Sequence, residues 1–136
     1  MIYNEKGGLK YLGTKDNAYF YLSEADKNIT EAVIDENCKI IGTAFKDCSS
    51  LKSVLIPQSV IYIGWEAFRG CKKLNGITIP ALVREIAYMA FADCSALQEI
   101  EFSGTVLQWE SIVKGNYWKD KVPAKSVTCI DGEESL

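Results

Sequence analysis

The 136-residue sequence predicts a single α/β solenoid, a coil with a parallel β-sheet on one face, short helical turns on the other, and a cap at each end. Three observations lead to this prediction. The pattern Ala-Phe-x-x-Cys-x-x-Leu occurs three times at a constant period of 23 residues, beginning at Ala44, Ala67 and Ala90. Each copy runs on into an alternating apolar strand pattern. Both ends depart from the repeat, as capping units must, because an open solenoid end would expose apolar core.

The repeats, which we place at residues 29–104, are expected to contain four strands. Each segment begins with an apolar residue, and two more follow three and five positions later. The last two are two residues apart, so they lie on the same face of a strand, because alternating side chains share one face. Pro57 and Pro80 end the middle two, since proline cannot donate to a sheet ladder. The segments are Ile29/Ala32/Ile34, Leu51/Val54/Ile56, Leu74/Ile77/Ile79 and Leu97/Ile100/Phe102.

After each strand the chain is expected to return with a second apolar pair facing inward. The stretch Gly64–Phe68 then predicts a short helical or 3₁₀ turn that carries phenylalanine and cysteine into the core. Because equivalent positions of stacked coils lie about 4.8 Å apart, we expect Phe45, Phe68 and Phe91 to form one core column. The inward pairs are Cys38 and Ile41, Val60 and Ile63, and Val83 and Ile86.

The first cap is expected at residues 1–28 and the second at residues 105–136. In the first, Leu9–Gly13 and Ala18–Leu22 flank the turn-rich Thr14–Asn17, which predicts an aromatic β-hairpin. In the second, Thr105 and Gln108 have the spacing of a capping box that opens a helix. A last strand at 127–130 is expected to follow, and then a frayed tail or the beginning of a linker at 131–136. The apolar face of the helix would hold Val106, Trp109, Ile112 and Val113.

Composition excludes several classes of function. The chain has no histidine, which removes Ser-His-Asp and Cys-His catalysis and most zinc sites, so we expect no enzyme, metal or cofactor. A net charge of -3 does not favour nucleic acid, and no apolar run is long enough for membrane insertion. Residues 1–8 lack a signal-peptide pattern, so the chain is either not exported or a mature or excised piece. A monomer is the default expectation.

The five cysteines are expected to stay reduced. Cys48, Cys71 and Cys94 recur at one repeat position, so their side chains should point the same way in successive coils. A spacing of about 4.8 Å between parallel Cβ vectors suits a disulfide poorly, because a disulfide joins Cβ atoms about 3.8 Å apart. We therefore expect buried thiols that act as small apolar side chains.

The candidate binding surface is the outward face of the strands, where partners usually dock in repeat proteins. Two interpretations of its exposed rows stay open, a neutral surface and a binding site, and the second is favoured by Val33 and Leu55, which are apolar where the strand faces water. A third row, at Asp35, Pro57, Pro80 and Ser103, is expected beside them. An alternative carbohydrate or protein contact set is aromatic: Trp65, Trp109 and Trp118, with Tyr62, Tyr88 and Tyr117. Of these, Trp65 is expected to face solvent, whereas Trp109 and Trp118 are expected to pack in the core or cap. The candidate ligand-binding residues are Glu31, Val33, Ser53, Leu55, Thr78, Glu99 and Glu101.

The repeats resemble the BspA-like leucine-rich repeats, whose unit reads Ile-Gly-x-x-Ala-Phe-x-x-Cys-x-x-Leu-x-x-Ile-x-Ile-Pro-x-x-Val; residues 63–83 are a near-complete copy. The resemblance implies a right-handed coil and a role in secreted or cell-surface bacterial proteins that bind a protein or glycan, such as adhesins. A spacer within a larger protein is the alternative, and a cytoplasmic location stays open. An enzyme would need clustered carboxylates, and Asp35 lies three coils from Glu99 and Glu101.

Overall fold

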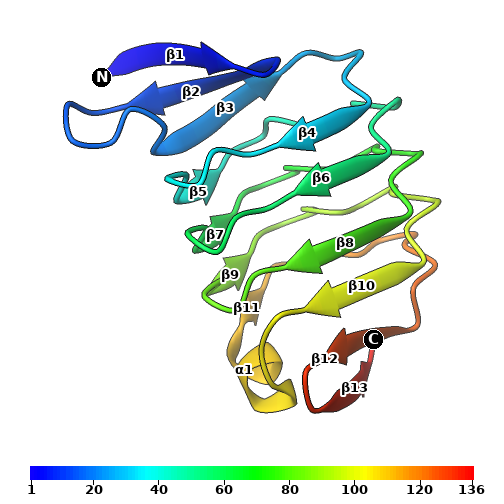
Figure 1. The fold of residues 1–136 in the computed structure, drawn as a ribbon. Helices are drawn as coiled ribbons and strands as arrows, with labels where there is room; N and C mark the ends of the chain where they lie inside the picture. Colours follow the sequence, from blue (N-terminus) through cyan, green and yellow to red (C-terminus); the bar gives the residue numbers. More distant parts are fainter.

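The computed structural model describes residues 1–136 and confirms a leucine-rich-repeat solenoid with stacked parallel strands (Figure 1). One face carries β4 (Glu31–Val33), β6 (Ser53–Leu55), β8 (Gly76–Ile79), β10 (Glu99–Phe102) and β12 (Ser126–Cys129). The strands expected in the repeats therefore form where the apolar alternation places them. We call the outward side of these strands the sheet face.

The opposite face differs from the expectation of short helical turns, because a second sheet covers it. The return segments form β5 (Ile40–Ile41), β7 (Tyr62–Ile63), β9 (Glu85–Ile86) and β11 (Val113–Lys114), which pair in parallel. All the expected inward pairs on these segments are buried, as predicted: Cys38 and Ile41, Val60 and Ile63, Val83 and Ile86.

The turns that carry phenylalanine into the core are hydrogen-bonded turns of the 3₁₀ type, such as the bond from the Ala67 N–H to the Gly64 carbonyl at 3.2 Å, and they form no α-helix. The Phe45 N–H donates to the Ala67 carbonyl at 2.9 Å, and the Phe68 N–H donates to the Ala90 carbonyl at 2.7 Å. These bonds join one coil to the next, whereas a helix would keep its backbone bonds within itself. The only α-helix is α1 (Val106–Ser111) near the C-terminus. No helix has the length and apolarity needed to cross a membrane.

The core follows the repeat period. The rings of Phe45, Phe68 and Phe91 are fully buried and stack with centroids 5.0 Å apart in both steps, close to the inter-strand spacing. The cysteine column lies beside them as free thiols. The Cys71 thiol donates to the Phe45 carbonyl at 3.1 Å, and the Cys94 thiol donates to the Phe68 carbonyl at 3.0 Å. Each cysteine thus ties its coil to the preceding one.

The first cap is larger than the expected hairpin. β1 (Ile2–Lys6) and β2 (Leu9–Gly13) form a hairpin around Gly7 and Gly8, whose φ angles of 59° and 80° suit a tight turn. The expected partner strand at 18–22 lies further on, as β3 (Tyr21–Ala25). β3 pairs with β5, so this cap extends the second sheet to seven strands.

The second cap confirms the helix start and corrects its end. Thr105 accepts from the Gln108 N–H and the Gln108 side chain accepts from the Thr105 N–H, which completes the capping box. The helix stops before Val113, which belongs to β11 and is exposed instead of sharing the buried face. The expected frayed tail is wrong: β13 (Gly132–Ser135) pairs antiparallel with β12.

Candidate binding surface on the sheet

The seven candidate residues lie together on the sheet face, and every one of them is exposed. Strand register places Val33 beside Leu55 and Thr78 beside Glu101. Leu55 keeps 59% of its surface exposed and Val33 keeps 70%, although apolar side chains on a sheet usually face the core. All seven candidate residues are therefore exposed on the same face: Glu31, Val33, Ser53, Leu55, Thr78, Glu99 and Glu101.

The third expected row is wrong. Asp35 is only 7% exposed, and Pro57 and Pro80 are buried as well, because the chain turns inward where the strands end. The Asp35 carboxylate accepts from Lys6 at 2.8 Å and from the Asn37 N–H at 2.9 Å. Burial by itself would raise the pKa of Asp35, but these hydrogen bonds and the Lys6 charge hold it below its usual value. Asp35 therefore connects the first coil to the first cap through its ion pair with Lys6.

The sheet face extends further than the repeat pattern indicates. Glu101 lies beside Thr128 of β12, and Thr128 lies beside Glu133 of β13. Both added residues are exposed. The Asp131–Gly132 pair is a hairpin-turn signal that could have identified β13 and hence Glu133. We call the resulting line of side chains the central row: Val33, Leu55, Thr78, Glu101, Thr128 and Glu133.

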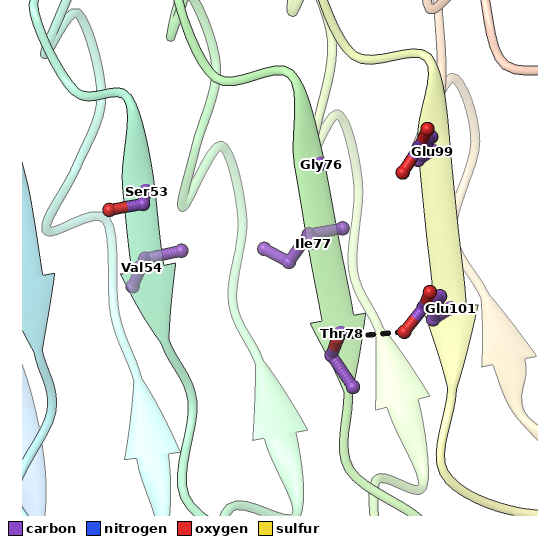
Figure 2. A pocket seen from close by; sticks show the side chains of 7 residues that line it. All are labelled: Ser53, Val54, Gly76, Ile77, Thr78, Glu99 and Glu101. Atoms are coloured by element: carbon purple, nitrogen blue, oxygen red, sulfur yellow. Dashed lines mark hydrogen bonds between the residues drawn. The ribbon is translucent and has the colours of Figure 1, made fainter.

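The sheet is interrupted between β6 and β8. β4 and β6 form one sheet, whereas β8, β10, β12 and β13 form another, so the facing edges of β6 and β8 are not paired with each other. A hollow of about 190 Å³ opens over this seam, lined by side chains of β6, β8 and β10 (Figure 2). Within it the Thr78 hydroxyl lies 3.4 Å from a Glu101 carboxylate oxygen.

Two further hollows adjoin the first. One, of about 390 Å³, is lined by Leu55, Pro57 and Thr78 among others and shares Thr78 with the seam hollow. The other, of about 300 Å³, is lined by Glu101, Glu133 and neighbouring side chains and shares Glu101 with the seam hollow. The three hollows follow the central row from an apolar end to an acidic end.

The acidic end carries uncompensated charge. Glu99, Glu101 and Glu133 take part in no ion pair, although other carboxylates of the protein do. No lysine or arginine lines any of the three hollows. No group of histidine, cysteine or acidic side chains is arranged to hold a metal ion. What this surface offers chemically is an apolar contact beside fixed negative charge.

A second exposed feature lies on the turns. The ring centroids of Trp65 and Tyr88 lie 5.5 Å apart, and those of Tyr88 and Tyr117 lie 6.3 Å apart. Trp65 and Tyr117 are exposed, as expected for Trp65, whereas Trp109 and Trp118 are buried in the second cap. We call Trp65, Tyr88 and Tyr117 the aromatic row.

The basic turn residues Lys46 and Arg69 take part in ion pairs between neighbouring coils. Lys46 lies 3.5 Å from Glu66, which also binds Arg69, and Arg69 lies 3.6 Å from Asp93. The resulting ion-pair ladder links neighbouring coils. Lys72 and Lys73 are exposed.

Comparison with known proteins agrees with the repeat geometry. The sequence model of the BspA type leucine rich repeat region matches residues 17–116 in six copies. No curated protein matches the chain. The crystal structure of a leucine rich cell surface protein from Faecalibacterium prausnitzii aligns over 82% of this chain and 42% of its own, with 20% identity and a TM-score of 0.42. The chain therefore spans less than half the length of that protein.

Proposed function

The chain belongs to the BspA-type leucine-rich repeat family, and from this we propose that it is a non-catalytic recognition module that binds a protein partner through its sheet face. The observation that carries the proposal is the central row, where exposed apolar side chains adjoin unpaired carboxylates over linked hollows. Apolar contacts ringed by polar groups are the usual make-up of a protein-binding patch.

A protein suits the sheet face better than a glycan does. No aromatic ring lies among the residues of the central row, and aromatic rings are the side chains on which sugar rings stack through their C–H faces. Glycan binding is instead a second candidate function, located at the aromatic row, where the exposed rings of Trp65 and Tyr117 flank the half-buried ring of Tyr88 across successive coils. The two candidates predict different surfaces, so one set of variants separates them.

Affinity capture tests the proposal. The purified chain is immobilised, exposed to surface extracts, and the retained proteins are identified by mass spectrometry. Leu55→Lys with Thr78→Lys should abolish capture, because both side chains line the sheet-face hollows. Leu82→Lys is the matched control, since Leu82 is 62% exposed and lines none of these hollows.

The outcomes distinguish the competing accounts. A partner lost only with the sheet-face variant supports recognition by the sheet. Loss with Trp65→Ala instead, in a glycan array, would move recognition to the aromatic row. Equal background from parent and sheet-face variant would contradict the proposal and favour a spacer without its own ligand.

We also propose a location at the cell surface or outside the cell, as the family resemblance implies. The supporting observation is membership of the BspA-type family alone. Protease treatment of intact source cells tests it, with an antibody against the chain as readout. Digestion without lysis is the expected result, and protection until lysis would contradict it.

A further inference from the structure

The central row changes character along its length in a way that specifies the chemistry of its partner. Val33 and Leu55 occupy one end, and Glu101 and Glu133 occupy the other. A threonine lies on each side of Glu101, Thr78 before it and Thr128 after it. The change from apolar to acidic takes place across the seam between β6 and β8. An occupant that covers the whole row must therefore offer an apolar group first and positive charge afterwards.

We propose that the partner presents an extended basic segment, in which one apolar residue precedes two lysine or arginine residues, lying across the strands along the central row. This inference rests on the proposed function and adds the class of partner. Charge complementarity carries it: Glu99, Glu101 and Glu133 have no internal cation, and no basic side chain lines the hollows. The apolar hollow at Leu55 is the second, independent feature.

Strand spacing sets the spacing of the groups on the segment. Leu55 and Glu101 are two coils apart across the seam, where the core rings of successive coils lie 5.0 Å apart, and Glu101 and Glu133 are two paired strands apart. Two strand spacings are roughly 10 Å. A polyproline II segment returns its side chains to one face every third residue, which advances about 9 Å. The apolar residue and the two basic residues are thus expected at positions i, i+3 and i+6.

A designed peptide tests this directly. The probe is the capped heptapeptide Leu-Ser-Ser-Arg-Ser-Ser-Arg, titrated into the ¹⁵N-labelled 136-residue chain and followed by amide chemical shifts. Saturable shifts are expected at Gly76, Thr78, Glu101 and Thr128. Binding should weaken as salt rises from about 0.05 M to about 0.5 M, because the screening length shortens. The same peptide with glutamate in place of both arginines should not bind.

Variants of the protein complete the test. Glu101→Gln with Glu133→Gln should raise Kd about three- to tenfold, the effect expected for two exposed ion pairs. The matched control, Asp16→Asn with Glu110→Gln, removes two exposed carboxylates that lie in no ion pair and should leave Kd unchanged. Shifts scattered over the basic turns, or equal binding of the acidic peptide, would overturn the inference.

The result can be told apart from failure of the proposed function. A protein captured by the chain, lost with Leu55→Lys and Thr78→Lys but retained in full by Glu101→Gln with Glu133→Gln, leaves sheet-face recognition standing. The basic-segment inference would then be wrong. Absence of any sheet-dependent capture, together with absence of peptide binding, would remove both.

Discussion

The ring of Phe45 lies parallel to the ring of Phe68, with centroids 5.0 Å apart and 9° between the planes. Phe68 has the same relation to Phe91, at 5.0 Å and 2°. The column then meets Trp118 edge-on at 6.3 Å, and Trp118 meets Trp109. A single aromatic stack therefore runs from the first coil into the second cap, so the cap closes the core that the repeats build.

Phe68→Ala should lower the free energy of unfolding by about 3–5 kcal/mol, because it leaves a cavity between two stacked rings in the middle of the column. Thermal or urea unfolding followed by circular dichroism measures the change. Trp65→Ala, which removes an exposed aromatic side chain of the neighbouring turn, is the control and should change stability far less. An unchanged midpoint for Phe68→Ala would show that the column does not hold the coils together.

Gly70→Ala should cost about 1–2 kcal/mol, the penalty of a left-handed backbone conformation for a residue with a Cβ atom. Gly70 has a φ of 79°, and an added Cβ would lie 2.6 Å from a carboxylate oxygen of Asp47. Gly76→Ala is the matched change in β8, where the nearest atom would be 3.7 Å away and φ is not positive. It should be neutral or stabilising. Equal destabilisation by both would contradict the geometry of the turn.

Asp35→Asn should make stability less sensitive to acid. Burial raises the pKa of Asp35, but the hydrogen bonds from Lys6 and Asn37 and the charge of Lys6 outweigh it, so the folded-state pKa is lower than normal. A depressed pKa stabilises the fold above the unfolded-state value, and this contribution is lost as pH falls through the folded-state value. Urea unfolding from about pH 6 to about pH 2 should therefore show a shallower decline for the variant than for the parent. An equal decline of stability with pH in parent and variant would contradict a stabilising ion pair between Asp35 and Lys6.

Cys38 should resist alkylation by iodoacetamide at about pH 8 in the folded protein, because the thiolate is the reactive form. Burial raises the pKa of Cys38 to about 11, so little thiolate exists at that pH. Mass spectrometry after a timed reaction measures the modification, and the urea-unfolded chain serves as the positive control. Rapid labelling of Cys38 in the folded chain would show that the first coil opens readily.

The parts of the fold that follow the 23-residue period could be predicted from the sequence. Phe68, Cys71 and Leu74 recur in a fixed order, and burying that pattern requires stacked coils with strands where the alternation lies. The candidate surface followed from the same register, because residues between core positions must face outward. The inward turn at Asp35 was missed, since its salt bridge to Lys6 depends on a strand outside the repeats.

The caps were harder because they are not periodic. Gly7–Gly8 and Asp131–Gly132 are both hairpin-turn pairs, yet β1 and β13, the outer strands of the two hairpins, have no apolar alternation that would reveal them. The second sheet was missed because two-residue strands leave no alternation to detect. The seam between β6 and β8 concerns backbone pairing across coils, which side-chain pattern does not encode.

Photo-crosslinking tests the central claim, recognition through the sheet face, most directly. A benzophenone side chain is placed at position 78 on the sheet face in one variant and at position 65 in the aromatic row in another. Both are irradiated in surface extract and analysed by mass spectrometry. The account predicts covalent adducts to a protein from position 78 and none from position 65. Adducts from position 65 alone, or none from either, would contradict recognition by the sheet.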